Sequence, residues 1–334
     1  MYSEKVSVVI PVYNAEKYIK DSIISVLNQT YKNIEIICID DCSTDHTLNI
    51  LSSIKDSRFF LYKNEMNRGV IYTRSRAYSL CNGEYIANMD ADDISHINRL
   101  EEQVLFLRTH PDIDVVGSWI NKIDEESQYL GRWKTPKKND EIKASLIFKM
   151  SLANPTIMFR SSLKAELVHE DRFYATEDYA LFCKLATKGH KFYNIPKTLL
   201  DYRILPESMS HSNVQKVDLS DNAHESVYEQ IFNDLNLDSL DSSLHRIIMK
   251  NEVKNEKQLH MVSNHLVYIR DNCPINYCNR NLLSTIISRL WAKSCLNVSQ
   301  YEKVSFLPSI LDQAFTFDIK AFKIILRASL KRTK

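Results

Sequence analysis

Three aspartates stand close together in Asp90-Ala91-Asp92-Asp93, directly after the apolar run Tyr85-Ile86-Ala87. A short apolar run preceded by Asn82-Gly83-Glu84 predicts a buried strand, so the aspartates lie at its end. Clustered carboxylates repel and raise one another's pKa unless a cation is present. A divalent ion such as Mg²⁺ or Mn²⁺ relieves this repulsion, takes oxygen ligands and leaves room for substrate phosphates. The alternative interpretation is a solvated acidic turn that caps the next helix.

The elements that must position these acids alternate along the first half of the chain. Apolar runs predict strands at 6–12, 34–39, 59–62 and 85–89, and helical spacing predicts helices at 15–27, 47–54, 69–80 and 97–109. This alternation predicts an α/β fold, with a mainly parallel sheet and helices on both faces. Ligands bind such sheets at the carboxyl ends of the strands. We therefore expect Tyr13-Asn14, Asp40-Asp41 and Asp90–Asp93, which each follow a strand, to converge on one edge.

The second half of the chain changes character. Further strands are predicted at 114–119 and 156–159, and a helix at 177–187. Beyond residue 213 helical patterns dominate, at 217–235, 244–269, 281–295 and 317–331. We therefore expect a catalytic α/β domain over residues 1–212 and a mainly helical region over residues 213–334.

Composition restricts the class of protein. The net charge of +1 gives no reason to expect nucleic acid as a partner. The 7 cysteines form no CxxC pair, which argues for reduced thiols in the cytoplasm. No signal peptide is recognised at the start, and no apolar run approaches the roughly 20 residues that span a bilayer. The expectation is a cytoplasmic protein, either soluble or peripheral to a membrane.

Five motifs occur in a fixed order: Pro11-Val12-Tyr13-Asn14, Ile39–Asp45, Asn67-Arg68-Gly69, Asp90–Asp93 and Thr176–Tyr179. In this order and spacing, residues 5 to 210 resemble the family 2 glycosyltransferases, which are inverting enzymes with the Rossmann-like GT-A fold. The resemblance implies a hexosyl- or N-acetylhexosaminyltransferase that uses a UDP-sugar and Mn²⁺ or Mg²⁺. It also implies a glycan or lipid-linked glycan acceptor, in the synthesis of polysaccharide, lipopolysaccharide or capsule.

The first three motifs suit a nucleotide. Tyr13 can present a ring face to a base, and Asp41 can accept a hydrogen bond from the uracil N–H. Asn67 opens a helix whose N-terminus favours anions, and Arg74 matches a family arginine that reaches the ribose or diphosphate. The residues expected to bind the nucleotide-sugar are Pro11, Val12, Tyr13, Asp41, Asn67, Arg74, Asp90 and Asp92.

The remaining motifs suit the metal and the proton transfer. By resemblance, Asp90 contacts the donor and Asp92 binds the metal. Leu205 stands where the family often has histidine, and the nearby His211 could complete the metal site or touch phosphate; a merely exposed or capping histidine is the alternative for His211. Asp178 matches the general base, and Glu177 orients the base or contacts the acceptor. The alternative is a pair of acids that only stabilises a helix N-terminus.

Two other functional classes compete with this interpretation. A nucleotidyltransferase would show a Gly-rich basic loop after the first strand, where this chain has Val12–Glu16. A non-catalytic nucleotide-sugar-binding module would have lost Asp92 or Asp178, and both are present.

The C-terminal residues carry a separate signal. From Ile319 onward the chain is basic, and its apolar residues recur at helical spacing. Such a helix can lie peripherally on the cytoplasmic face of an inner membrane, or it can pack its apolar stripe onto the protein.

Overall fold

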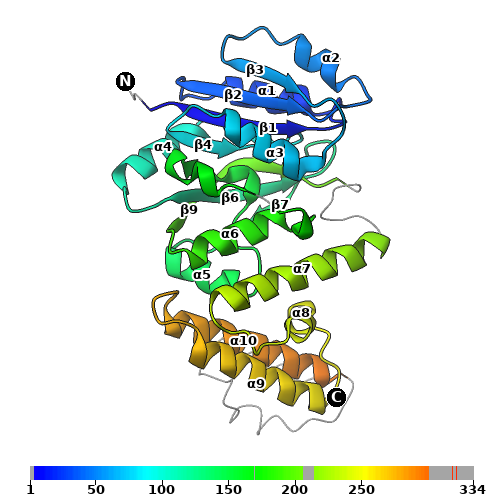
Figure 1. The fold of residues 1–334 in the computed structure, drawn as a ribbon, viewed down its shortest axis with the longest axis vertical. Coiled ribbons are helices and arrows are strands. Elements are labelled where there is room, and N and C mark those ends of the chain that lie inside the picture. Colours follow the sequence, from blue (N-terminus) through cyan, green and yellow to red (C-terminus); the bar gives the residue numbers. More distant parts are fainter. Residues whose placement is uncertain (1–3, 169, 206–213, 301–317, 319–320, 322–334) are drawn as a thin grey trace. The chain divides into compact units, whose positions relative to one another are not determined.

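The computed structural model describes residues 4–168, 170–205 and 214–300, with Asp318 and Ala321. The chain forms two compact units (Figure 1). The sheet unit comprises Met1–Lys138, Ser151–Leu181 and His190–Lys216, and the helical unit comprises Asn139–Met150, Phe182–Gly189 and Val217–Lys334. The helical unit thus takes two segments from within the expected 1–212 domain. Contacts within the helical unit hold these two segments. The Tyr228 hydroxyl donates a hydrogen bond to the Phe148 carbonyl at 3.4 Å, and the Cys183 thiol donates to the Leu146 carbonyl at 3.6 Å.

The sheet unit is built around one sheet. Its strands are β1 (Val6–Val12), β2 (Ile34–Asp40), β3 (Phe59–Lys63), β4 (Tyr85–Asn88), β5 (Ile94–Ser95), β6 (Val115–Ile123), β7 (Tyr129–Trp133), β8 (Met158–Arg160) and β9 (Phe192–Arg203). They are ordered β3-β2-β1-β4-β8-β6-β9-β5, and β7 pairs with β6 (Figure 1). Strands β1 to β4 are parallel, whereas β8 runs antiparallel to both β4 and β6. The predicted fold class is confirmed, although β5, β7 and β9 were not predicted.

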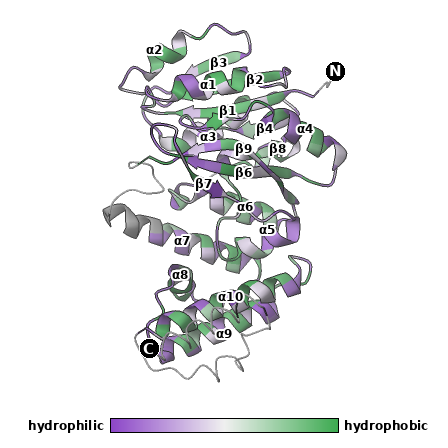
Figure 2. Cartoon of the chain, turned by 180° about the vertical axis from the view of Figure 1, so that it is seen from behind, coloured by the Kyte–Doolittle hydropathy of each residue, from purple (hydrophilic) through white to green (hydrophobic). Residues whose placement is uncertain are grey.

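Helices cover both faces of this sheet. They are α1 (Ile19–Leu27), α2 (Thr47–Ser52), α3 (Gly69–Leu80), α4 (Arg99–Thr109) and the first turns of α6 (Glu177–Thr187), with 3-10 turns at Asn154–Thr156, Ser161–Glu166 and Asp171–Phe173. Alternate β1 residues such as Val8 and Ile10 share one core with Ile23 of α1 and Val104 of α4. Helix α3 contacts β1 and β2 from the other face, in front of the sheet in Figure 1. Strands β1 and β2 are mostly green in Figure 2, as expected of strands covered on both sides.

The parallel register brings the predicted strand ends together. Val12 lies opposite Asp40, and Val9 lies opposite Asn88. The loops that follow are joined by hydrogen bonds. The Thr44 N–H donates to the Asn14 side chain at 2.8 Å, and the Ser22 hydroxyl donates to the Asp90 carbonyl at 3.0 Å. The expected convergence on one edge is therefore present.

The helical unit contains α5 (Asn139–Leu146), the end of α6, α7 (Val214–Asp234), α8 (Ser242–Lys250), α9 (Glu256–Asn272) and α10 (Arg280–Val298). The prediction of one helix over 244–269 is wrong. Asn251 ends α8 in the left-handed region at φ 57°, and Asn255 caps α9 by accepting the Gln258 N–H at 2.8 Å. None of the described helices is long and apolar enough to cross a membrane. The helix predicted at 317–331 lies almost wholly outside the described residues.

Candidate active site

The acid loop, residues 90–93, follows β4 at the carboxyl edge of the sheet. Asp90 and Asp92 are partly exposed, whereas Asp93 is fully buried. Burial, and then the charge of Asp90, raises the pKa of Asp92 to about 6. Burial and both neighbouring acids raise the pKa of Asp93 well above its usual range. The loop therefore concentrates negative charge where the surroundings disfavour it.

Arg74 connects the acid loop to the second pair of acids. The residue is 5% exposed, and its side chain extends from α3. Nη2 lies 3.0 Å from Oδ1 of Asp90, and Nη1 lies 3.6 Å from Oε1 of Glu177 at the start of α6. One buried guanidinium thus brings together the two acidic motifs that are far apart in the sequence.

Asp178 stands beside Glu177 in the first turn of α6. It is partly buried, and the Tyr179 N–H donates to its Oδ1 at 2.7 Å. Burial, and then the charge of Glu177, raises the pKa of Asp178 to about 7, although Arg74 opposes the shift. A carboxylate with this pKa exchanges protons near neutral pH, as a general base must.

Asp41 organises the loop that precedes α3. Its Oδ1 accepts hydrogen bonds from the Asn64 side chain at 2.6 Å and the Arg68 N–H at 2.9 Å, and its Oδ2 accepts from the Gly69 N–H at 2.8 Å. Gly69 has φ +80°, a conformation that favours glycine. Asn67 is exposed in this loop. Asp41 therefore fixes the loop, and its contact with uracil stays a prediction.

The β1 motif presents one aromatic ring. Tyr13 is 47% exposed, so its ring is accessible to a ligand. Val12 is in the core, and its carbonyl accepts the Asp41 N–H at 2.7 Å; Pro11 is partly buried. Of these three residues, Tyr13 has the side chain best placed to contact a base.

Buried polar residues that the expected site did not include support the end of β4, where the acid loop begins. Arg99 donates from Nη2 to the Asn88 carbonyl at 2.7 Å and from Nε to Gln103 at 3.1 Å. The Asn88 side chain donates to Asn154 at 2.8 Å. These contacts hold the end of β4. The polar character of an otherwise apolar strand end was the signal that could have indicated them.

The side chains of the acid loop can bind a divalent cation only if a bound substrate supplies further ligands to it. Within the described ranges no group of three His, Cys, Asp or Glu side chains could hold a metal ion, and His211 lies outside them. Asp90 and Asp92 supply the carboxylate oxygens that Mg²⁺ and Mn²⁺ prefer, and such ions are commonly held by one or two carboxylates plus substrate phosphates. Oδ2 of Asp93 is buried and has no hydrogen-bond partner among the residues that the structure describes. The donor set therefore suits a metal completed by phosphates.

The sequence is similar to known glycosyltransferases. The glycosyl transferase family 2 model matches residues 7–165. An uncharacterized glycosyltransferase of Methanocaldococcus jannaschii is 35% identical over 216 residues, 63% of this chain and 74% of its own length. The Escherichia coli UDP-Glc:alpha-D-GlcNAc-diphosphoundecaprenol beta-1,3-glucosyltransferase WfaP is 32% identical over 226 residues, 67% of this chain and 87% of its own length. Some relatives are longer: the match spans 30% of one from Rickettsia bellii.

Solved structures agree on the fold. Staphylococcus aureus TarS in complex with UDP-GlcNAc superposes with a TM-score of 0.58 at 20% identity, over 88% of this chain and 89% of that one. The Pyrobaculum calidifontis mannosyltransferase in complex with GDP-Man and Mn²⁺ gives 0.52 at 13% identity, over 100% and 82%. The converging strand ends and the family match together show that this chain belongs to glycosyltransferase family 2 and is a glycosyltransferase with the GT-A fold.

Proposed function

We propose that the protein transfers a hexosyl or N-acetylhexosaminyl group, with inversion, from a UDP-sugar to a hydroxyl of a glycan or lipid-linked glycan. The main support is the Arg74 contact, which joins the acid loop to the first turn of α6. The names of two Escherichia coli relatives support the context. WfaP uses UDP-Glc and a diphosphoundecaprenol-linked sugar, and WbnJ is an O-antigen biosynthesis glycosyltransferase, 31% identical over 223 residues.

Asp178 acts as the general base in this proposal. Its carboxylate takes the proton of the acceptor hydroxyl while that oxygen attacks the anomeric carbon from the side opposite UDP. The bond from the anomeric carbon to the diphosphate oxygen breaks, and UDP leaves with the electron pair. Glu177 contacts the acceptor or orients the base, and its charge keeps the pKa of Asp178 near neutrality.

The donor is held at the edge formed by β1, β2 and β4. Tyr13 stacks on the base, Asp41 accepts from uracil, and Asn67 and Arg74 face the ribose and diphosphate. Asp92, with Asp90 and the predicted ligand His211, would hold Mn²⁺ or Mg²⁺, which when bound stabilises the charge on the departing diphosphate.

The proposed acceptor indicates a cellular location for the protein. A lipid-linked glycan is presented at a membrane, so we propose a cytoplasmic enzyme held peripherally at the inner membrane by the basic segment from Ile319 onward. That segment lies almost entirely outside the described residues.

The test is a donor screen with the purified protein. UDP-Glc, UDP-Gal, UDP-GlcNAc and GDP-Man are incubated with a lipid-linked sugar acceptor, with Mn²⁺ or with a chelator. We expect transfer from a UDP-sugar with Mn²⁺, loss of transfer with the chelator, and a β-linked product from the α-linked donor by NMR. Transfer from GDP-Man alone, retention of configuration, or full activity with the chelator would each overturn the corresponding part of the proposal.

A further inference from the structure

Arg203, the last residue of β9, donates hydrogen bonds to the acid loop. The whole residue is 3% exposed. Its backbone N–H donates to Oδ1 of Asp93 at 2.9 Å, and its Nε donates to the Asp92 carbonyl at 2.9 Å. Both the backbone and the side chain of Arg203 therefore bind the segment that carries the proposed metal ligand.

The other end of the guanidinium binds the turn between β6 and β7. Nη1 donates to the carbonyls of Asp124 at 2.9 Å and Glu125 at 3.0 Å, and to the Ser127 hydroxyl at 3.0 Å. This turn was not expected to contribute to the site. Through Arg203 it supports the acid loop.

Arg203 also reaches the segment between the Tyr13 loop and α1. Its guanidinium carbon lies 4.4 Å from the centre of the Tyr18 ring, a cation–π distance. The neighbouring Lys17 forms an ion pair with Glu125 at 3.1 Å, which links the same two segments at the surface. The acid loop, the β6–β7 turn and the start of α1 thus meet at one side chain.

Only arginine suits this position. Its planar guanidinium offers five N–H donors in a rigid fork and can stack on a ring, whereas lysine offers one compact ammonium group. A buried cation is tolerated when its donors are hydrogen-bonded. The carbonyl and hydroxyl partners of Arg203 satisfy Nε and Nη1 in this way, and they leave its positive charge beside the clustered aspartates.

We propose that Arg203 is a positioning residue: it fixes the acid loop against the β6–β7 turn and so orients Asp92 toward the donor diphosphate. This inference rests on the proposed function. Residues behind a ligating carboxylate commonly change metal affinity or activity by about 10–100-fold when they are replaced.

Arg160, the last residue of β8, provides a matched control. Its Nε donates to the Ile113 carbonyl at 2.8 Å, and its Nη2 donates to the carbonyls of Leu107 at 2.7 Å and His110 at 3.1 Å. Its guanidinium carbon lies 5.9 Å from the Tyr85 ring centre. Arg160 therefore makes the same kinds of contact without touching the acid loop.

The experiment compares Arg203→Met, Arg203→Lys and Arg160→Met in the full chain. We expect Arg203→Met to weaken Mn²⁺-dependent UDP binding by about 10–100-fold in calorimetry. Arg203→Lys should fall between Arg203→Met and the wild type. The UDP affinity of Arg160→Met should stay within about 2-fold of the wild-type value. Its unfolding temperature should nevertheless fall by about as much as that of Arg203→Met. Equal losses of UDP affinity in Arg203→Met and Arg160→Met would overturn the inference, and so would wild-type affinity in Arg203→Met.

Hydrogen exchange without any ligand separates this inference from the proposed function. Faster exchange confined to residues 90–95 and 124–127 in Arg203→Met or Arg203→Lys, but absent from Arg160→Met, supports the positioning role. Unchanged exchange in these segments overturns it. A wild-type protein that binds no UDP contradicts the proposed function, whereas the exchange result still tests the role of Arg203.

Discussion

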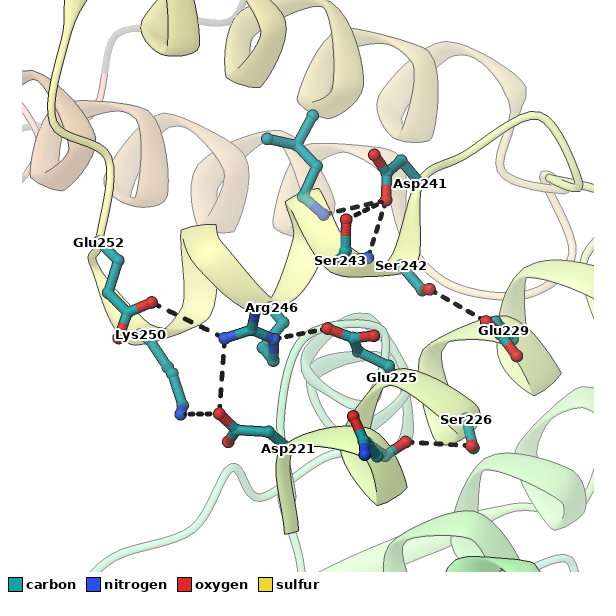
Figure 3. Close-up of polar contacts among 12 residues, drawn as sticks. Asp221, Glu225, Ser226, Glu229, Asp241, Ser242, Ser243, Arg246, Lys250 and Glu252 are labelled. Carbon is teal, nitrogen blue, oxygen red and sulfur yellow. Dashed lines mark hydrogen bonds and ion pairs between the residues drawn. The ribbon is translucent and has the colours of Figure 1, made fainter. Parts of the chain in front are cut away.

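Two clusters of charged side chains in this protein are built in opposite ways. In the α7–α8 network, formed by Asp221, Glu225, Arg246, Lys250 and Glu252, acids and bases alternate (Figure 3). Arg246 lies 2.5 Å from Glu225, 3.5 Å from Asp221 and 3.7 Å from Glu252, and Lys250 pairs with Asp221. The hydrogen bond that Arg246 donates to Glu225 raises the pKa of Arg246, so each charge there stabilises its neighbours.

The acids of the candidate active site are compensated less completely. Burial and like charge raise the pKa of Asp92 and of Asp178, which favours their neutral forms. Arg74 meets Asp90 and Glu177 but does not cancel these shifts. Buried carboxylates that lie beside one another, at a cost in stability, are typical of a functional site. Charges that are paired with opposite charges are typical of a structural network.

The largest expected effect sharpens the contrast at Asp178. Asp178→Asn removes the proton acceptor with little change of shape, so turnover should fall by about 10²–10⁴-fold while UDP binding is kept. Steady-state kinetics and calorimetry measure the two quantities. Asp221→Asn, in the α7–α8 network, should leave turnover near the wild-type value. Near-normal turnover in Asp178→Asn would exclude Asp178 as the base.

The next prediction concerns pH. Because Asp178 must be ionised to accept a proton, kcat should rise with pH and reach half of its plateau near the Asp178 pKa of about 7. Glu177→Gln removes the charge that raises this pKa, so the midpoint should move to lower pH. The pH–rate profiles of the two proteins measure the shift. A midpoint that moves upward or does not move would contradict the assigned coupling.

A smaller effect is expected in the α7–α8 network. Arg246→Met leaves three carboxylates with one lysine, so the free energy of unfolding should fall by about 1 kcal/mol while kcat is unchanged. Denaturant titration measures this loss. Arg270→Met breaks a pair with the more exposed Asp271 and should cost less. A large loss of kcat in Arg246→Met would break the distinction between the two clusters.

The last effect, which is absent at neutral pH, concerns two buried histidines of the helical unit. Nδ1 of His245 lies 3.0 Å from Nε2 of His265. Burial lowers the pKa of His265 to about 4 and that of His245 well below the usual value. The unfolded chain then binds more protons than the folded one between pH 4 and 6.5, so stability is full above this range and falls as the pH drops through it. His265→Gln should flatten this dependence in denaturant titrations. An equally steep dependence in that variant would show that other groups cause it.

Local patterns predicted much of the fold. Helices α3 and α6 occupy the predicted residues, and β1 has the predicted bounds, because alternating and helical spacing record burial directly. The break between α8 and α9 was missed although Asn251 and Asn255 carry its signal. Isolated asparagines are common within apolar helical patterns. The helical spacing on both sides therefore predicted one continuous helix.

The candidate site was only partly predictable. The acid loop and the Glu177-Asp178 pair could be identified as motifs, and Arg74 from its family position. Arg203 could not be assigned, because its partners at 92–93 and 124–127 are brought near only when β9 pairs with β5 and β6. No local spacing encodes a contact between residues so far apart in the sequence.

By itself, the sequence determined the alternation of strands and helices from β1 to β4, the edge at which the acids gather and the family. Those properties depend on side-chain pattern and on the parallel register of neighbouring strands. The tertiary structure alone decided which charges are paired. It placed Arg74 between two acidic motifs, Arg203 beneath the acid loop and Asp41 on the loop before α3. The physical reason is that burial and hydrogen-bond geometry, which set each carboxylate's pKa, arise only when distant segments pack together.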